Sequence, residues 1–316
     1  MVLSLLGVCA SDGDGSGNGA PPTLTTRVTS ATDATTTTLG PVPEGSAVVA
    51  AAGDIACVPG QAPSDAGCRM AETAALVEAA SPAAVLTLGD NQYETGTLAD
   101  YQGSYDPTWG RFKAITRPSA GNHEFAGEKA KGYFDYFGAA AGPPGTGWYS
   151  FDLAGWHLVS LNSNCSVIEG CGPGSAQHDW LRADLAASDA KCTLAYWHHP
   201  RFSSGYHGND ESVGPLWDLL EAESAELVLS GHDHHYERFA ALAPDGTPDP
   251  AGIRQFVVGT GGRSLYPTLG ARKGSEVRRS ATYGILVLTL SPESYRWNFT
   301  ATPGDTFTDA GQGVCN

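Results

Sequence analysis

The octet "GHDHHYER", residues 231–238, places three histidines, an aspartate and a glutamate directly after a mostly apolar run at 225–229. Imidazole nitrogens and carboxylate oxygens are common ligands of divalent and trivalent cations in proteins. His232 and His234 are two residues apart, so on an extended segment both side chains point to the same side. The spacing therefore predicts two metal-binding imidazoles at the end of a strand, each able to bind a different ion.

Four other apolar runs end in polar residues of similar kinds. They end at Asp54, at Asp90, at Asn122 with His123, and at the pair 198–199 in "WHHP". A glycine precedes the polar residue in all but the last. Because glycine permits a sharp departure of the backbone from a strand, we expect the five strand ends to meet at one edge of a sheet.

The polar residues at these ends match the ligands of a paired metal site. Two cations held about 3.5–4 Å apart need imidazole nitrogens, an amide oxygen and a carboxylate that can bridge them. Taken singly, each residue has an ordinary explanation as a turn, a helix cap or a hydrogen-bonded histidine. The joint pattern favours a dinuclear site, and its candidate ligands are Asp54, Asp90, Asn122, His198, His232 and His234.

The elements that would position these residues follow an α/β pattern. From residue 46 onward, short apolar runs alternate with segments whose apolar residues recur every three or four positions. This spacing predicts helices at about 68–80, 99–113, 128–138, 175–188 and 213–224. Five further runs, at 147–155, 156–163, 253–262, 282–290 and 294–301, are expected to form antiparallel strands.

Composition limits the partners of the chain. It has 316 residues, a formal net charge of -16 and a pI near 4.8. Broad binding to nucleic-acid polymers or to an anionic membrane surface needs clustered Lys and Arg, so neither is expected. Any anionic substrate must therefore be held by local positive charge.

The first ten residues are apolar and are interpreted as the remnant of an export signal. Within them "LLGVC" resembles a lipoprotein processing box, which makes Cys9 a candidate lipid-attachment residue and predicts a membrane tether. Residues 11–45, rich in Gly, Ser, Thr and Pro, are expected to form a disordered linker, and 46–316 one catalytic domain. Secretion or display at the cell surface follows.

Apart from Cys9 the chain contains six cysteines, and an even set favours an oxidising compartment. Sequence alone leaves their connectivity open. If the cysteines nearest in sequence pair locally, the remaining bond joins Cys192 to Cys315. Free buried thiols are the alternative.

Five blocks resemble the metal-binding blocks of calcineurin-like metallophosphoesterases. They are "GD" at Asp54, "GDNQY" at 89–93, "GNHE" at 121–124, "HHP" at 198–200 and "GHDHHYER" at 231–238. Within that superfamily the chain is similar to the purple acid phosphatases. It has Ala56 where most relatives have a histidine, and it has the tyrosine, Tyr93, that this branch supplies three residues after the second aspartate. The resemblance implies a four-layer α/β/β/α sandwich, with two packed mixed β-sheets flanked by helices.

The resemblance also implies a role for each matching residue. Asp54, Tyr93 and His234 would bind Fe³⁺, and Asn122, His198 and His232 would bind Zn²⁺, Mn²⁺ or Fe²⁺, with Asp90 as the bridge. The family pattern His, any residue, Pro selects His198 over His199. His123 and His207 would face the substrate, and Glu237 or His235 would orient a ligating ring.

The function implied is hydrolysis of phosphate monoesters on small phosphorylated substrates by attack of a metal-bound hydroxide. His123 would protonate the departing alkoxide, with help from His207. A phosphodiesterase, nucleotidase or nuclease on the same scaffold is the alternative. A hypothesis from another class is a non-catalytic surface protein that binds ligands. Relatives of that kind typically lose ligands, and here none is missing.

Overall fold

The computed structural model describes residues 42–316. The expected export signal at 1–10 with Cys9, and residues 11–41 of the expected linker, lie outside the described residues. Within the described part, thirteen strands form two sheets. The first sheet has the order β13 (Thr308–Val314), β12 (Ser294–Ala301), β11 (Gly284–Ser291), β1 (Ala47–Ala52), β2 (Ala84–Leu88) and β3 (Thr116–Ser119).

The second sheet also mixes parallel and antiparallel pairs. Its order is β10 (Ser275–Arg279), β8 (Tyr236–Leu242), β9 (Ile253–Val258), β7 (Leu227–Ser230), β6 (Cys192–Tyr196), β5 (Trp156–Ser160) and β4 (Tyr149–Leu153). The helices are α1 (Met70–Ala80), α2 (Leu98–Asp100), α3 (Asn122–Phe125), α4 (Lys131–Phe137), α5 (Ala176–Ala187) and α6 (Gly214–Ala222). None of the helices in this described part is long and apolar enough to cross a membrane.

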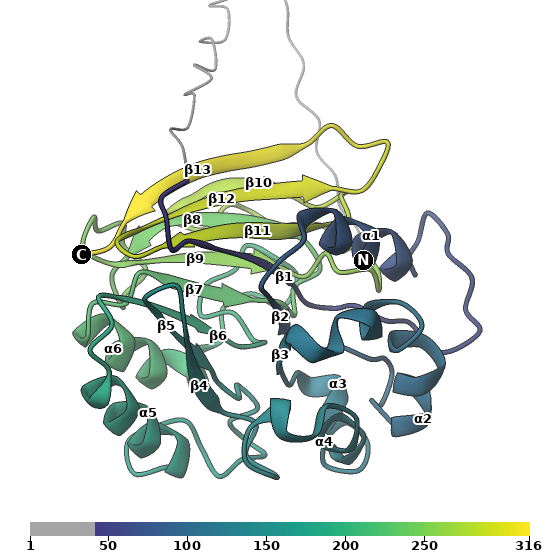
Figure 1. Ribbon diagram of the computed structural model, residues 1–316, viewed down its shortest axis with the longest axis horizontal. Coiled ribbons are helices and arrows are strands. Elements are labelled where there is room, and N and C mark those ends of the chain that lie inside the picture. The colour runs from purple at the N-terminus through teal and green to yellow at the C-terminus, as the bar shows by residue number, and fades with distance from the viewer. Residues whose placement is uncertain (1–41) are drawn as a thin grey trace, which may run out of the picture. The chain divides into compact units, whose positions relative to one another are not determined.

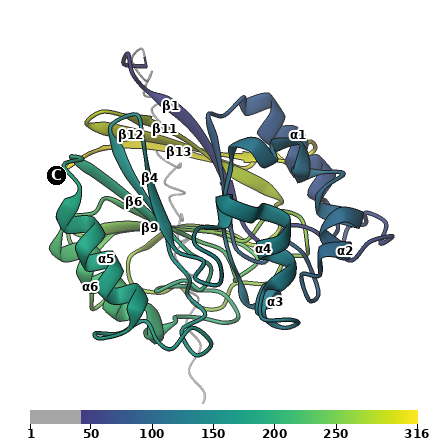
Figure 2. The ribbon, with the colours of Figure 1, turned by 60° about the horizontal axis from the view of Figure 1, so that its bottom comes forward.

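The layers are arranged as the predicted α/β/β/α sandwich (Figure 1). In Figure 2, α5 and α6 lie on one side of the strands, and α1, α2, α3 and α4 lie on the other. This confirms the predicted fold class.

Alternation of side chains along the central strands explains the packing. On β7, Leu227 and Leu229 join the core that also contains residues of the first sheet, whereas Val228 joins the core that contains side chains of α5 and α6. Successive side chains of a strand point to opposite faces, so an uninterrupted apolar strand can be covered on both sides. The second sheet is therefore buried between the first sheet and the helices α5 and α6.

The prediction of one helix over about 99–113 was wrong. The segment instead contains α2, a π-helical turn at Tyr101–Tyr105 and a 3₁₀-helix at Trp109–Ile115. Pro107 has no backbone N–H to donate to a preceding turn, and its ring blocks continuation of a regular helix. The other four predicted helices are present, each with slightly shorter bounds.

The strand predictions also need correction. The run at 253–262 contains β9, which is antiparallel to β8 but parallel to β7. The run at 156–163 contains β5, which is antiparallel to β4 but parallel to β6, so neither strand has only antiparallel neighbours. The edge strand β13, "TDAGQGV", was not predicted because it is mostly small and polar. The rings of Trp297 and Tyr295 on β12 lie against Gly311 and Gly313, where a Cβ would collide with them.

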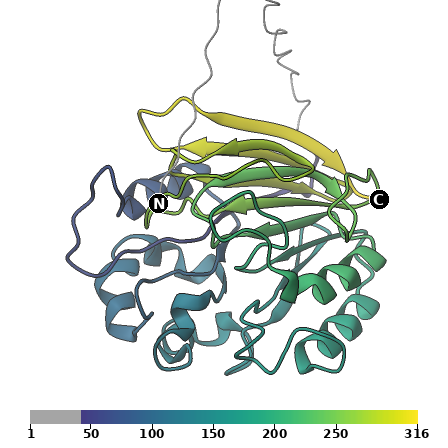
Figure 3. The ribbon, with the colours of Figure 1, turned by 180° about the vertical axis from the view of Figure 1, so that it is seen from behind.

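Three disulfides link the six cysteines of the described residues. They join Cys57 to Cys68, Cys165 to Cys171, and Cys192 to Cys315. This is the local pairing with Cys192 bound to Cys315. Free thiols are excluded for these six residues in this structure. The last bond connects the start of β6 to the chain just after β13, and Figure 3 shows the C-terminus at the end of that strand.

Candidate metal centre

The polar residues predicted to meet do so at the carboxyl ends of neighbouring strands. Asp54 follows β1, Asp90 follows β2, and Asn122 begins α3 just after β3. His198 follows β6 and His232 follows β7. Within each sheet these strands are parallel to one another, so their carboxyl ends lie at one edge. The two sheets each contribute part of one group of side chains.

The sharp turns at these strand ends are made differently from the sequence-based expectation. Gly89 has a positive φ of 78°, but at Gly231 the contribution is space: a Cβ there would lie 2.6 Å from Asp54 Oδ2. The strained backbone is on the functional residues, with φ of 60° at Asp54, 46° at Asp90 and 68° at His232. Such conformations cost about 1–3 kcal/mol each and are maintained by the surrounding fold.

The first cluster gathers around the phenol oxygen of Tyr93. This oxygen lies 2.9 Å from Asp54 Oδ1, 3.0 Å from Asp90 Oδ2 and 3.0 Å from His234 Nε2. His234 Nε2 is also 3.1 Å from Asp54 Oδ1. All four side chains are buried. Two carboxylates, one phenol and one imidazole thus converge on a volume the size of an ion.

The second cluster gathers around His198. Its Nε2 lies 3.1 Å from Asn122 Oδ1, 3.2 Å from Asp90 Oδ2 and 3.2 Å from His232 Nδ1. Asp90 Oδ2 therefore belongs to both clusters, as the atom that a bridging ligand would supply. Asp54, Asp90 and His198 also offer ligand atoms that all lie within 4.8 Å of one another.

His199 lies beside this cluster but is held by another group. Its Nδ1 is 2.8 Å from the hydroxyl of Ser163, which also accepts a hydrogen bond from the His199 backbone N–H. His198, in contrast, donates its Nδ1–H to the carbonyl of Leu88 at 2.8 Å, which leaves Nε2 facing the shared carboxylate. This geometry favours His198 as the ligand, although a ring nitrogen of His199 also lies within 4.8 Å of ring nitrogens of His198 and His232.

The charges in the site suit a cation. Burial works against ionisation of Asp90, but the charge and hydrogen bond of His198 outweigh it and hold the pKa of this carboxyl well below its usual value. Burial lowers and Asp90 raises the pKa of His198, with a net result of about 9. Burial, together with Asp54 and Asp90, raises the pKa of Tyr93. A cation bound here would displace the protons on His198 and Tyr93, and the donor set fits two such ions.

The two residues predicted to face substrate lie at the edge of the clusters. His123 donates its Nδ1–H to the carbonyl of Glu94 at 2.6 Å, and its Nε2 is 3.9 Å from Asp90 Oδ2. His207 is exposed, and its ring centre is 4.3 Å from that of His232. The seven predicted ligands and both of these histidines therefore lie together, while their roles stay predictions.

Glu124 was not predicted as a functional residue, although it lies within the "GNHE" block. Its buried carboxylate accepts hydrogen bonds from the backbone N–H groups of Asp90, Asn91, Gln92 and Gly121 and from the Tyr101 hydroxyl. Burial and the nearby Asp90 raise its pKa. Glu124 fixes the turn that carries Asp90 against the turn that carries Asn122.

The groups that orient the ligating ring of His234, in the octet "GHDHHYER", differ from the predicted ones. His234 Nδ1 lies 3.0 Å from Ser264 Oγ, and the ring of Tyr266 is stacked on His234 at 4.0 Å. Glu237 pairs with His235 at 3.1 Å and accepts hydrogen bonds from Ser204, so it orients no ligating ring. Ser264 and Tyr266 carry no motif in the sequence, and only their position in the fold identifies them.

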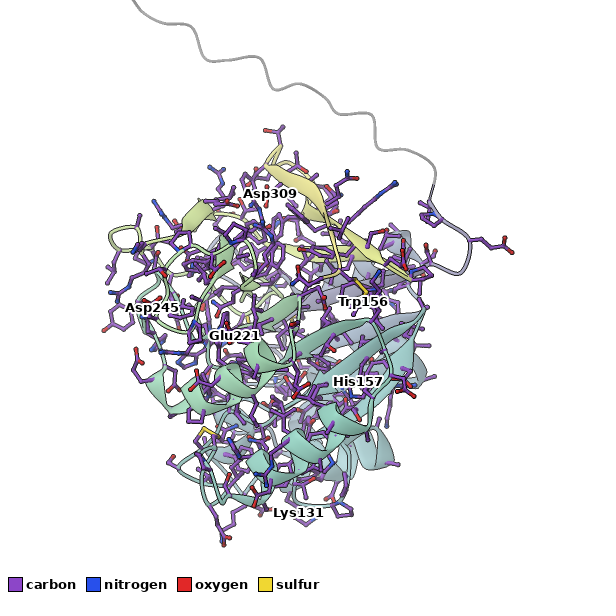
Figure 4. All side chains as sticks on the ribbon, turned by 90° about the vertical axis from the view of Figure 1, so that its left-hand side faces the viewer. Lys131, Trp156, His157, Glu221, Asp245 and Asp309 are labelled. Carbon is purple, nitrogen blue, oxygen red and sulfur yellow. A yellow bond between two sulfur atoms is a disulfide. The ribbon has the colours of Figure 1, made fainter. Side chains whose placement is uncertain are left out.

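Asp233, between the two ligating histidines, holds the loop that carries His207. Its carboxylate accepts from the hydroxyl of Ser203 at 2.5 Å and from the backbone N–H groups of His207 and Gly208. The octet therefore contains two candidate ligands and, between them, a residue that supports the loop of His207. On β8, Tyr236 and Arg238 both bind Asp309 of β13, which Figure 4 labels.

The family model for calcineurin-like phosphoesterases matches residues 48–236, which contain all nine predicted site residues. Similar curated proteins from Arabidopsis thaliana include purple acid phosphatase 15, 28% identical over 219 residues, and purple acid phosphatase 22, 32% identical over 209 residues. These matches cover 58% and 57% of this chain, and 40% and 47% of the relatives. The chain thus spans less than half the length of these relatives.

Solved structures show the same fold. A purple acid phosphatase from yellow lupin seeds superposes with a TM-score of 0.65 at 18% identity, covering 84% of this chain and 53% of that one. GAP50, described as the anchor in the inner membrane complex of Plasmodium, gives a TM-score of 0.61 at 15% identity, covering 86% and 89%. The family match spans more than half of the chain and the residues of its blocks converge, so this protein belongs to the calcineurin-like phosphoesterase family, with purple acid phosphatases among its relatives.

Proposed function

We propose that the protein is a dinuclear metal-dependent hydrolase of phosphate monoesters. The observation that supports this most directly is the position of Asp90 Oδ2, 3.0 Å from the Tyr93 hydroxyl and 3.2 Å from His198 Nε2. One carboxylate oxygen shared by two sets of donors is the arrangement that a two-metal hydrolase needs. The purple acid phosphatases among the relatives supply the expectation of monoester substrates.

The ligands divide into two sets in this proposal. Asp54, Tyr93 and His234 hold the first ion, and Asn122, His198 and His232 hold the second. A phenolate is a strong ligand for Fe³⁺, so we assign iron to the first position and Zn²⁺, Mn²⁺ or Fe²⁺ to the second. Bound together, the ions supply positive charge for the phosphoryl oxygens and lower the pKa of water. Their charge of about +5 exceeds the about -3 of Asp54, Asp90 and Tyr93.

The protein's own groups complete the reaction. His123 keeps its Nδ1–H on the Glu94 carbonyl, so its Nε2 is the nitrogen available to pass a proton to the departing alcohol oxygen. The backbone N–H of His123 also donates to Asp90 Oδ1 at 2.8 Å, which couples the position of this histidine to the shared carboxylate. His207, on a loop held by Asp233 and with its ring centre 4.3 Å from that of His232, orients the ester.

The location proposed for this chemistry is outside the reducing cytoplasm. Three disulfides in the described residues support an oxidising compartment. Secretion, and tethering of a 46–316 catalytic domain through Cys9, remain part of the proposal. Growth of cells with a labelled lipid precursor, followed by comparison of the protein with its Cys9→Ala variant, tests the tether.

The function is tested with purified full-length protein loaded with iron and zinc. Phosphate release is measured from a monoester and a diester of the same alcohol, and metal content is measured in parallel. We expect two ions per chain and faster release from the monoester. Faster diester cleavage would transfer the assignment to a phosphodiesterase. Two bound ions without hydrolysis of either ester would favour a binding protein.

The iron assignment has a separate test. A Tyr93→Phe variant should lose the visible absorption band that a phenolate–iron bond gives, while a variant of a buried tyrosine outside the clusters, Tyr133→Phe, keeps it. If the wild type has no such band with two ions bound, iron is removed from the proposal and the hydrolase assignment stays.

A further inference from the structure

A cavity of about 320 Å³ lies directly beside the second ligand cluster and has no role in the chemistry described so far. Asn122 and His199 border it, together with Ser163, Asn164, Asp210 and Ser212. Asn122 also places its Oδ1 3.1 Å from His198 Nε2, so it belongs both to the cluster and to the cavity wall. If the phosphoryl group of an ester is bound at the cluster, the rest of the ester can therefore extend into this cavity.

Asp210 offers a free acceptor to the cavity. Its Oδ1 accepts hydrogen bonds from the backbone N–H and the hydroxyl of Ser212, at 2.8 and 2.6 Å. Among the described residues, no group donates to its Oδ2. One oxygen of this carboxylate is thus committed to the local turn, and the other is available to a bound molecule.

Asn164 offers a second acceptor. It is only 6% exposed, and its Nδ2 donates to the carbonyl of Gly121 and to Asn162 Oδ1. These bonds fix which end of the amide is the nitrogen. Within the described residues nothing donates to its side-chain oxygen. Asn164 borders the cavity, so a bound hydroxyl or ammonium can donate to this oxygen in place of water.

His199 supplies a donor at the boundary between cavity and cluster. The Ser163 hydroxyl accepts the His199 backbone N–H, so its own proton is available to His199 Nδ1. In that arrangement the ring proton of the neutral imidazole is on Nε2, and no described group accepts from that nitrogen. The ring can then donate to an oxygen of the ester.

The charge of the wall restricts what enters. Asp210 is the one charged residue on the wall of this cavity, which contains no Lys or Arg. Arg201, close by in sequence, is paired with Glu211. An alcohol bearing a second phosphate or a carboxylate would meet a carboxylate and no compensating cation, which is unfavourable where solvent is partly excluded.

We propose that this cavity receives the alcohol part of the substrate and selects small alcohols that carry hydroxyl or ammonium donors and no anionic group. The volume is at the lower end for ligand pockets, which suits an alcohol of a few carbons. This proposal rests on the proposed function, and it adds a substrate class and Asp210 as a specificity-determining residue.

The test compares three esters of small alcohols with the metal-loaded, full-length protein. Glycerol 3-phosphate and 3-phosphoglycerate share a three-carbon skeleton and differ by a carboxylate, and ethanolamine phosphate adds an ammonium. We expect kcat/KM for the first to exceed that for 3-phosphoglycerate by about tenfold. Asp210→Asn should remove most of this ratio, and Asp210→Lys should reverse it. A kcat/KM for ethanolamine phosphate above that for glycerol 3-phosphate would indicate recognition of an ammonium group. A lower value would indicate recognition of hydroxyl groups.

Asp249→Asn is the matched control. Asp249 is exposed and accepts from the backbone N–H two residues ahead at 2.9 Å, as Asp210 does, but it does not border the cavity. Its ratio should equal that of the wild type. A ratio that stays unchanged in both Asp210 variants, in enzyme that hydrolyses the esters, would overturn the proposal. Absence of hydrolysis of all three esters and of an aryl phosphate would instead overturn the proposed function.

Discussion

Asp90 is the residue on which the site converges. Its Oδ2 lies between the two clusters, its Oδ1 accepts the backbone N–H of His123, and its own N–H donates to Glu124. Its backbone is also in the left-handed region, with φ 46°. Asp90 is therefore the candidate bridging ligand, and it also contacts the candidate proton donor, His123, and the supporting carboxylate of Glu124.

The adjacent histidines His198 and His199 give the first prediction. His198→Ala should lose one of the two bound ions and reduce kcat by at least about a thousandfold, because its Nε2 faces the shared carboxylate. His199→Gln should keep both ions and lower kcat/KM by about tenfold or less, because its ring is held by Ser163 outside the ligand set. Metal content measured by elemental analysis, together with steady-state kinetics, checks both. The reverse outcome would make His199 the ligand.

At this scale the sequence predicted every residue that the structure brings into the two clusters. For six of the seven, ligand chemistry restricted the residue type and the strand-end pattern restricted the position, whereas Tyr93 came from the resemblance to purple acid phosphatases. Ser264 and Tyr266 could not be predicted in this way, since a hydroxyl or a stacked ring reaches His234 from any loop that passes nearby. The family pattern selected His198 over His199, and the hydrogen bond of His198 to the Leu88 carbonyl favours the same residue.

The elements position the site through the turns that follow the strands. Glu124 at the start of α3 accepts from the N–H groups after β2 and from Gly121, so one buried carboxylate connects two strand ends. Buried backbone N–H groups need acceptors, and here a side chain supplies them where the sheet ladder has ended.

Glu124→Gln gives the second prediction. The amide would point an NH₂ group at N–H donors that now share a carboxylate, so the free energy of unfolding should fall by about 3 kcal/mol, and the affinity for metal should fall with it. Denaturant titration and metal analysis measure the two effects. Glu128→Gln, an exposed residue of the same segment, is the control and should change neither. Equal behaviour of the two variants would contradict the role given to Glu124.

His157 on β5, shown in Figure 4, gives a prediction about pH. Its two ring nitrogens lie 2.9 Å from Asp184 on α5 and 2.9 Å from Asp152 on β4. The hydrogen bond to Asp184, opposed by burial and helped by Asp152, raises the pKa of this histidine. A pKa raised in the folded state means that the stabilisation is fully present below the unfolded pKa, about 6.5, and is lost as pH rises through the folded value.

His157→Asn should therefore lower Tm more at pH 5 than at pH 8.5. The comparison is made as the Tm difference between variant and wild type at each pH, because other groups titrate in both proteins. His178→Asn changes another buried histidine, on α5, and provides the comparison. A Tm difference for His157→Asn that is the same at both pH values would show that the charge of His157 does not stabilise the fold.

Helices were predicted correctly where apolar periodicity is strong. Strands were missed where a neighbouring strand, and not the local sequence, determines that they form. The four confirmed helices carry apolar residues at three- and four-residue spacing and pack on a sheet. The strands β10 and β13 are edge strands with few apolar residues, and they form because β8 and β12 offer free ladder groups beside them. Such pairing depends on the partner strand more than on the residues of the edge itself.

At the scale of the whole molecule, the site is shared by the two sheets. The first sheet supplies the strand ends with Asp54, Asp90 and Asn122, and the second supplies those with His198 and His232. The alternation of elements predicted an α/β domain, and the resemblance implied the four layers with two packed sheets. The residues through which the two sheets contact each other are visible only in the fold. A feature that fixes one sheet on the other far from these strand ends is expected to support the stability of the fold more than the site.

The Cys192–Cys315 disulfide is such a feature, and it gives the last prediction. It closes a sequence separation of 123 residues, against 6 for Cys165–Cys171. In the chain-entropy model the longer loop contributes about 5 kcal/mol and the shorter about 2 kcal/mol, so removing the first bond by paired Cys→Ala changes should lower the free energy of unfolding more. Denaturant titration of both double variants measures this. Metal content of the folded Cys192/Cys315 variant should stay unchanged, because Cys192 begins β6 and His198 follows its other end. Equal losses of stability in the two variants would show that loop closure is not what this bond contributes.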